Sequence, residues 1–241
     1  DSSTSRGLGD VYKRQIYTMQ EEGVDLIELG VPFSDPAADG PVIQRADERA
    51  LAQGVDIFKV FELVRKIRNN VEVPMVFLLY YNVMVQYGIE KFFKRCQETG
   101  VDGLIIPDLP YEESDEIKEY TEKYGVYQIS LVSPTSKDRI KNIAKDAKGF
   151  LYCISSLGVT GEKSSFVTNF DEFVGTIKKY TDVPACVGFG VSNGKQVKEL
   201  TKYFDGAIVG SAIVKSIATG ESVEERINNL RAKIKDLKSG L

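Results

Sequence analysis

The chain has 241 residues, of which 42% are hydrophobic and 27% charged, and its formal net charge is −4. This is enough for one substantial core, and no basic run is dense enough to indicate a nucleic-acid-binding protein. No apolar stretch approaches the roughly 18 residues of a membrane span. The chain contains no histidine, so acid–base chemistry near neutral pH would have to use Asp, Glu, Tyr, Lys or Cys.

The three cysteines, Cys96, Cys153 and Cys186, are scattered and show neither metal-binding nor redox spacing. Scattered cysteines of this kind are typical of buried free thiols in a reducing compartment. We therefore expect a cytoplasmic protein without a metal site.

Residues 1–15 differ from the rest of the chain. They are polar, they show no hydrophobic period, and they lack the apolar core of a signal peptide. We expect a leader that is non-native or disordered, followed by a globular domain over residues 16–241.

From residue 16 onward, short apolar runs alternate with amphipathic stretches of helical period. Asp56 is a candidate N-cap for one predicted helix, and Gly100 and Gly125 are candidate stops for two others. This alternation predicts a parallel sheet. The phrases "GVD" and "VP" recur where strands begin. The predicted strands are 24–31, 73–80, 103–106, 127–132, 149–155, 184–190 and 206–210.

Glycines cluster after the last three predicted strands, and no glycine-rich phosphate turn follows the first one. This favours a (β/α)8 barrel (TIM barrel) over a doubly wound open sheet, because the barrel's phosphate site lies near its seventh and eighth strands. Residues 16–22 resemble the tail of a helix whose strand would lie upstream. We therefore expect a barrel that lacks its first strand and most of its first helix.

The stretch "ELGVPFSDPAADGP", residues 28–41, places carboxylates at the end of the first predicted strand. If Ile27 packs outward, Glu28 faces inward, where burial raises the pKa of a carboxyl group, and Gly30 leaves space beside it. This arrangement suits a general acid/base, and a structural Glu is the alternative. Asp39 precedes a predicted helix and could be its N-cap, and Asp35 reads as a turn residue.

At this point the sequence closely resembles a known family. "DLIELGVPFSDPAADGPVIQ" is similar to the signature of the tryptophan synthase alpha chain family. The resemblance covers essentially everything from residue 16 onward. Its further motifs are "LLYYN" (78–82), "LIIPDLPYEE" (104–113), "SSLGVTG" (155–161), "GFGVS" (188–192) and "IVGSAIVK" (208–215).

The resemblance implies a (β/α)8-barrel lyase of tryptophan biosynthesis that cleaves indole-3-glycerol phosphate to indole and glyceraldehyde 3-phosphate. The family needs no cofactor in this chain and works in an alpha2beta2 heterotetramer, whose beta chain carries pyridoxal phosphate. Glu28 would be the acid/base, and Asp39 would stabilise the indole N–H. Tyr80 and Tyr152, at matching strand positions, would wall the aromatic ring, although ordinary packing explains each tyrosine nearly as well.

Four residues are candidates for phosphate binding, because backbone N–H groups at glycines and at a helix start can approach an anion. They are Gly161, Gly190, Gly210 and Ser211. Each glycine could instead simply serve a turn.

The loop over residues 157–169 could close as a lid over the substrate, and the resemblance implies that Thr160 then approaches Asp39. The alternative is a merely disordered surface loop. By the same resemblance, Asp108 and Pro110 belong to the face that docks the beta chain.

Two other functions remain open. The chain could be a non-catalytic docking subunit for the beta chain, and indole production without that partner would separate the two roles. It could also be another phosphate-binding barrel enzyme, such as a sugar-phosphate isomerase, although this leaves the acidic loop unexplained.

Overall fold

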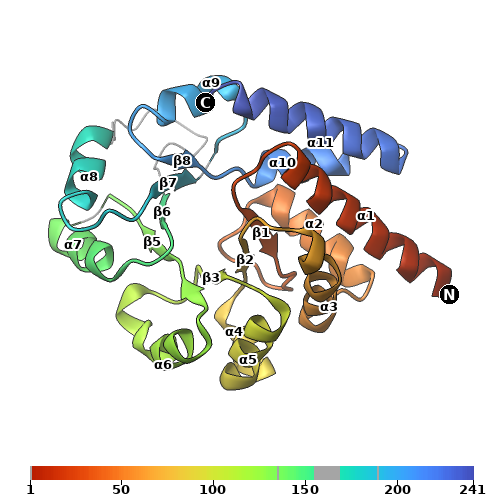
Figure 1. The fold of residues 1–241 in the computed structure, drawn as a ribbon, viewed down its shortest axis with the longest axis horizontal. Helices are drawn as coiled ribbons and strands as arrows, with labels where there is room; N and C mark the ends of the chain where they lie inside the picture. The colour runs from red at the N-terminus through yellow and green to blue at the C-terminus, as the bar shows by residue number, and fades with distance from the viewer. Residues whose placement is uncertain (1, 135, 155–168, 189) are drawn as a thin grey trace. The chain divides into compact units, whose positions relative to one another are not determined.

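The computed structural model describes residues 2–134, 136–154, 169–188 and 190–241 (Figure 1). The chain divides into two compact units. Unit 1 comprises residues 1–127 and 213–235, and unit 2 comprises residues 128–212 and 236–241. One four-stranded sheet has the order β1-β2-β3-β4 and the other the order β5-β6-β7-β8. Among the described residues, no helix is both long and apolar enough to cross a membrane.

Unit 1 carries the first sheet, apart from Gln128 of β4, and its helices. Its strands pair in parallel, with Ile27 opposite Met75 and Val76 opposite Gly103. Two α-helices near the end of the chain, α10 and α11, contribute most of their residues to this unit. In chain order the elements are α1 (Ser2–Glu21), β1 (Ile27–Gly30), α2 (Pro41–Ala52), α3 (Ile57–Ile67), η1 (Arg68–Asn70), β2 (Met75–Leu78), α4 (Tyr81–Tyr87), α5 (Ile89–Thr99), β3 (Gly103–Ile105), η2 (Tyr111–Glu113), α6 (Asp115–Tyr124), β4 (Tyr127–Gln128), α10 (Ser211–Ala218) and α11 (Val223–Lys238).

Unit 2 carries the second sheet, whose strands also pair in parallel. Its elements are β5 (Ser130–Val132), α7 (Lys137–Asp146), β6 (Leu151–Ile154), α8 (Phe170–Ile177), β7 (Ala185–Gly188), α9 (Gly194–Leu200) and β8 (Gly206–Ala207). Every predicted strand run therefore contains a strand, but the run 127–132 is divided between β4 and β5.

The predicted helix signals at Asp56, Gly100 and Gly125 are confirmed. The Asp56 side chain accepts the backbone N–H of Lys59 and so caps α3. Gly100 and Gly125 end α5 and α6 in the left-handed conformation, with φ of 83° and 65°. Glycine adopts this conformation without the steric cost that a Cβ would add.

The core of unit 1 lies between the sheet and its helices. Phe61 of α3, Phe77 of β2 and Phe92 of α5 are fully buried. The Phe61 ring centroid lies 5.3 Å from that of Phe77 and 5.4 Å from that of Phe92. Ile27 and Val31 join this cluster. These residues define the helix-facing side of β1 and β2.

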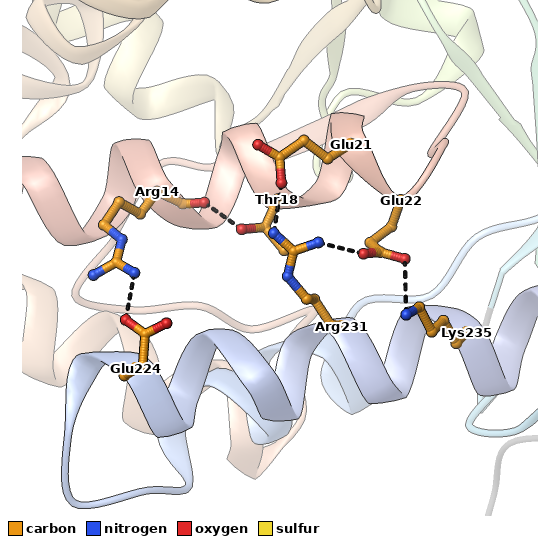
Figure 2. Close-up of polar contacts among 7 residues, drawn as sticks. All are labelled: Arg14, Thr18, Glu21, Glu22, Glu224, Arg231 and Lys235. Atoms are coloured by element: carbon orange, nitrogen blue, oxygen red, sulfur yellow. Dashed lines mark hydrogen bonds and ion pairs between the residues drawn. The ribbon is translucent and has the colours of Figure 1, made fainter.

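Helices α1 and α11 lie side by side, as Figure 2 shows. Arg14 of α1 pairs with Glu224 at 2.6 Å, while Arg231 of α11 pairs with Glu21 and Glu22 at 2.5 Å. Lys235 adds a longer contact to Glu22 at 4.0 Å. Exposed ion pairs are individually weak, but several here share the same partners.

The expected boundary after residue 15 differs from the structure, because α1 runs through it from Ser2 to Glu21. Gln15 and Ile16 are 7% and 4% exposed, so the helix packs inward on both sides of that position. The sequence did not reveal this, because the partners of α1 lie about 200 residues away in α11. The non-native origin of residues 1–15 stays a prediction.

An aspartate holds the start of β2 in unit 1. The Oδ2 atom of Asp102 accepts the N–H of Met75 at 2.8 Å and pairs with the Arg68 guanidinium at 3.1 Å. Arg68 also donates to the Val73 carbonyl at 2.9 Å. The first "VP" phrase thus marks the start of β2, which Arg68 holds to η1 and Asp102 holds to the loop between α5 and β3.

In unit 2 an aspartate likewise holds the start of a strand, at β7, where the second "VP" phrase occurs. The Oδ2 atom of Asp205 accepts the N–H of Ala185 at 2.7 Å and pairs with Lys178 at 2.5 Å. Burial by itself raises the pKa of Asp205, but the hydrogen bonds from Lys178 and Ala185 outweigh it and lower the pKa below its ordinary value of 3.8. The charged form is therefore the one that stabilises the fold.

We expect Asp205→Asn to lower the free energy of unfolding by about 1–2 kcal/mol at neutral pH, since charge-assisted hydrogen bonds are lost at a partly exposed site. The pKa of Asp205 is lower in the folded chain, so its contribution is complete above pH 3.8 and disappears as the pH falls through the folded-state value. Urea unfolding at pH 7 and near pH 3 measures this difference.

The exposed Asp182, in the loop before β7, provides the matched control. Asp182→Asn should leave the unfolding free energy nearly unchanged at both pH values. Equal losses in the two variants would contradict the role given to Asp205.

Candidate active site

Glu28 of β1 points away from the helix-facing side of the sheet. Its neighbour Ile27 belongs to the core against the helices, and side chains alternate along a strand, so Glu28 and its partner Val76 lie on the other face. The Oε2 atom of Glu28 is buried and has no hydrogen-bond partner among the described residues. Gly30 is exposed, and a Cβ built there would meet nothing within 4 Å. The structure thus places Glu28 as expected, beside open space.

The environment of Glu28 keeps its proton available near neutral pH. Burial, and then the charge of Asp39, raise the pKa of Glu28 from 4.5 to about 7. A buried carboxylate without partners is unfavourable, and protonation relieves that cost. Near neutral pH this group can therefore both give and take a proton.

Asp39 is held by a tyrosine rather than used as a helix cap. The N-cap of α2 is Gly40, which makes no side-chain cap, so the N-cap interpretation of Asp39 is not supported. Instead, the Tyr80 hydroxyl donates to Asp39 Oδ2 at 2.7 Å and accepts the N–H of Ala38 at 2.9 Å. The Phe33 ring stacks on Tyr80, with centroids 5.0 Å apart and an interplanar angle of 24°.

Tyr80 is therefore a polar partner as well as an aromatic surface. Burial first, and then the bond to Asp39, raise the pKa of its hydroxyl, which stays protonated and keeps donating. Tyr80 and Tyr152 do not occupy matching strand positions. Tyr80 follows β2 as the N-cap of α4, while Tyr152 is the second residue of β6.

Asp35 takes the turn role predicted for it. Its carbonyl accepts the N–H of Ala37 at 2.9 Å, and its side chain accepts the Ser34 hydroxyl at 2.6 Å. The N–H of Asp39 donates to the Pro36 carbonyl at 3.1 Å. The loop is thus tightly folded around residues 34–39.

Asp108 and Pro110 are exposed in the loop between β3 and α6 of unit 1. Asp108 Oδ1 accepts the N–H of Tyr81 at 2.9 Å, which satisfies a free donor at the start of α4. The sequence did not predict this hydrogen bond between Asp108 and the start of α4. The bond ties the loop of the expected docking face to the helix that follows Tyr80.

In unit 2, Tyr152 lies over a glycine of the next strand. A Cβ at Gly188 would come within 2.4 Å of the Tyr152 ring and hydroxyl, so the tyrosine occupies space that only glycine leaves free. Gly190 has a φ of 75°, which favours glycine. Gly210 and Ser211 are exposed, and Ser211 begins α10 as expected.

The remaining predicted residues, Thr160 and Gly161, lie outside the described residues, as does the loop 157–169 apart from Asn169. Asn169 caps α8 through its side chain. Within the described ranges, no group of three His, Cys, Asp or Glu side chains could hold a metal ion.

Comparison with known proteins identifies the family. The family model described as "Tryptophan synthase alpha chain" matches residues 9–241. The chain belongs to the tryptophan synthase alpha chain family.

Individual relatives agree with this assignment. The tryptophan synthase alpha chain of Alkaliphilus metalliredigens is 47% identical over 227 residues, covering 93% of this chain and 85% of the relative. Tryptophan synthase subunit alpha from Campylobacter jejuni superposes with a TM-score of 0.84 at 39% identity, covering 95% of this chain and 90% of that one. A Mycobacterium tuberculosis tryptophan synthase structure gives 0.84 at 34% identity, covering 96% and 86%.

Membership of the tryptophan synthase alpha chain family confirms the predicted fold class, a (β/α)8 barrel. It also confirms the reaction class, a lyase of tryptophan biosynthesis that cleaves indole-3-glycerol phosphate. The missing first strand and the roles of individual residues stay predictions.

The raised pKa of Glu28 predicts how stability depends on pH. Because the pKa is higher in the folded chain than the ordinary 4.5, protonated Glu28 favours the fold at low pH, and that advantage is lost as the pH rises through about 7. Glu28→Gln should therefore increase the free energy of unfolding at pH 8.5, by up to about 3 kcal/mol, and not at pH 4.5. Urea unfolding at the two pH values measures it.

Glu48→Gln, which changes an exposed carboxylate of α2, is the matched control and should show no such pH-dependent gain. A Glu28→Gln variant whose stability relative to the parent is the same at both pH values would show that the carboxyl is solvated.

Proposed function

We propose that Glu28 performs both proton transfers in the cleavage of indole-3-glycerol phosphate. Protonated Glu28 gives its proton to indole C3, which leaves the ring nitrogen electron-poor. The resulting carboxylate then takes the proton of the glycerol hydroxyl next to the ring. As that oxygen becomes a carbonyl, the carbon–carbon bond breaks, its electron pair returns to the ring, and indole and glyceraldehyde 3-phosphate separate.

One observation carries this proposal: a buried carboxyl oxygen of Glu28 has no hydrogen-bond partner in the described part of the chain, and a Cβ at nearby Gly30 would meet only open space. A structural glutamate would use its buried oxygens in hydrogen bonds, because an unsatisfied buried acceptor costs about 1–3 kcal/mol. The pKa of about 7 suits a group that must act as acid and base in one turnover.

Asp39 is the proposed stabiliser of the indole N–H. Cleavage places positive charge on that nitrogen, and an anion held in place before the reaction lowers the barrier because it need not reorganise. The hydrogen bond from Tyr80 supports this role, since it fixes Asp39 Oδ2 and leaves the other carboxylate oxygen without a bond from Tyr80. The Tyr80 ring is the proposed wall for the indole, with Tyr152 as a second one.

The phosphate is assigned to Gly161, Gly190, Gly210 and Ser211, with Thr160 as the lid contact to Asp39. The support comes from the described members of this set. Gly190 has the positive φ that favours glycine, and Ser211 begins α10, whose first N–H groups carry partial positive charge.

The proposed partner is a beta chain carrying pyridoxal phosphate, in an alpha2beta2 assembly. Asp108 and Pro110 are exposed and available for docking. The cofactor belongs to the partner, and this chain contributes the lyase site alone. A cytoplasmic location fits the free cysteines, of which Cys96 and Cys153 are buried thiols.

Glu28→Gln should abolish indole release while the chain stays folded. General acid–base catalysis contributes about 10²–10⁴-fold, so we expect a loss of at least about 10²-fold in kcat. In the parent, kcat should fall as the pH rises through about 7, because the proposed reaction begins with protonated Glu28. Indole release at several pH values, with circular dichroism for the fold, checks both expectations.

Glu48→Gln should keep parental activity. A Glu28→Gln variant within a few-fold of the parent removes Glu28 from the mechanism. A parent that binds the beta chain but releases no indole would assign the chain to docking instead of catalysis.

The partner proposal has its own measurement. Mixed with a tryptophan synthase beta chain, the chain should co-elute in size-exclusion chromatography at the mass of two copies of each. Asp108→Ala should weaken that association while leaving the circular dichroism spectrum intact. Separate elution of the two chains at micromolar concentration argues against the proposed assembly.

A further inference from the structure

Phe33, to which the mechanism above gives no part, lies at the start of the acidic loop. It is half-buried, whereas the next residue, Ser34, is exposed. The pairing of β1 with β2 continues into this loop, because the N–H of Val31 donates to the Leu78 carbonyl at 2.9 Å. Phe33 follows Val31 by two residues, and Tyr80 follows Leu78 by two residues. The strand register therefore brings the two aromatic residues to the same place.

The rings of Phe33 and Tyr80 are stacked. Their centroids lie 5.0 Å apart and their planes differ by 24°. Stacked rings at this separation attract each other beyond the simple burial of apolar surface. The stack covers one face of the Tyr80 ring, so an indole that packs on Tyr80 as proposed above would use the other face.

The far end of the Tyr80 side chain is held by the same loop. Its hydroxyl accepts the N–H of Ala38 at 2.9 Å and donates to Asp39 Oδ2 at 2.7 Å. Because the phenol group is rigid, a tilt of the ring displaces the hydroxyl from Asp39. Phe33 has no polar side-chain group with which to bind Asp39, so it acts through the Tyr80 ring.

The orientation of Tyr80, rather than its protonation, decides whether this donor reaches Asp39. Burial first, and then the bond to Asp39, raise the pKa of the Tyr80 hydroxyl, so that it keeps its proton near neutral pH. An anion that opposes charge in the transition state is effective only when it is fixed in advance. The support behind the Tyr80 ring is therefore relevant to catalysis.

We propose that Phe33 is a positioning residue of this active site, whose ring supports one face of Tyr80 and thereby keeps the Tyr80 hydroxyl directed at Asp39. The inference rests on the proposed function of Asp39. It assigns to an apolar residue of the acidic loop an effect on the rate of the reaction.

A second aromatic pair in unit 1 provides a matched control. The ring centroids of Phe58 and Tyr87 also lie 5.0 Å apart, with an interplanar angle of 33°. Phe58 belongs to α3 and is 61% exposed, and Tyr87 is the last residue of α4, at the other end of that helix from Tyr80. Phe58→Leu therefore removes a similar ring contact outside the acidic loop.

Two substitutions at Phe33 test its effect on the reaction. In Phe33→Leu, kcat should fall by about tenfold to 10²-fold, because small misplacements of catalytic groups have effects of this size. KM should change by less than about threefold, since Asp39 opposes a charge that appears only in the transition state. Phe33→Tyr keeps a stacking ring and should restore kcat to within about threefold of the parent. Phe58→Leu should retain the parental kcat.

A Phe33→Leu variant with kcat within about threefold of the parent overturns the inference. So does a Phe33→Tyr variant as slow as Phe33→Leu, which would show that the stacked ring is not what matters. Equal losses of kcat in Phe33→Leu and Phe58→Leu would also overturn it, because they would indicate a general loss of packing.

Hydrogen exchange of the Ala38 amide tests the inference without any turnover, since this amide donates to the Tyr80 hydroxyl. Exchange should become about tenfold faster in Phe33→Leu and stay near the parental rate in Phe33→Tyr and Phe58→Leu. Tyr80→Phe, which removes the acceptor, gives the rate without this bond. An unchanged rate in Phe33→Leu overturns the inference. If the parent releases no indole, the proposed function fails separately, and this exchange rate alone decides whether Phe33 positions Tyr80.

Discussion

The chemistry proposed for this chain depends on the environment of one carboxyl group, that of Glu28. Glu28 has an oxygen that is buried without a hydrogen-bond partner among the described residues, and Asp39 adds a like charge. In most buried positions such a group would be replaced or satisfied, because isolation from water disfavours the charged form. Burial and the charge of Asp39 make the ionised form of Glu28 unfavourable, so its pKa rises to about 7. A pKa near neutral pH supports the proposed proton transfers.

The rest of unit 1 maintains this arrangement by fixing the groups around Glu28. β1 is paired along its length with β2, which sets the face on which Glu28 lies. Tyr80 fixes Asp39 at a definite place, and Asp108 fixes the start of the helix that follows Tyr80. Asp102 holds the beginning of β2. These separate hydrogen bonds fix the start of β2, the start of α4 and the Asp39 side chain of the acidic loop.

Much of this was predictable from the sequence, because it follows from local patterns. Strand positions, the cap at Asp56, the glycine stops and the inward direction of Glu28 all derive from periodicity and turn chemistry. What escaped prediction depends on contacts between distant segments. The bond from Tyr80 to Asp39 joins residues 41 positions apart. The ion pairs that fasten α1 join residues 210 positions apart, so residues 1–15 looked unattached when taken alone. The division of 127–132 into two strands likewise has no local signal.

The pairing of α1 with α11 has a consequence for how the protein is made. Unit 1 is discontinuous, because all of residues 128–212 are synthesised between its two segments. The acidic side chains at the end of α1 meet Arg231 only after about 200 further residues have left the ribosome, which takes on the order of 10–40 s at ordinary elongation rates. During that time α1 cannot form its ion pairs with Glu224 and Arg231, because α11 has not yet been synthesised.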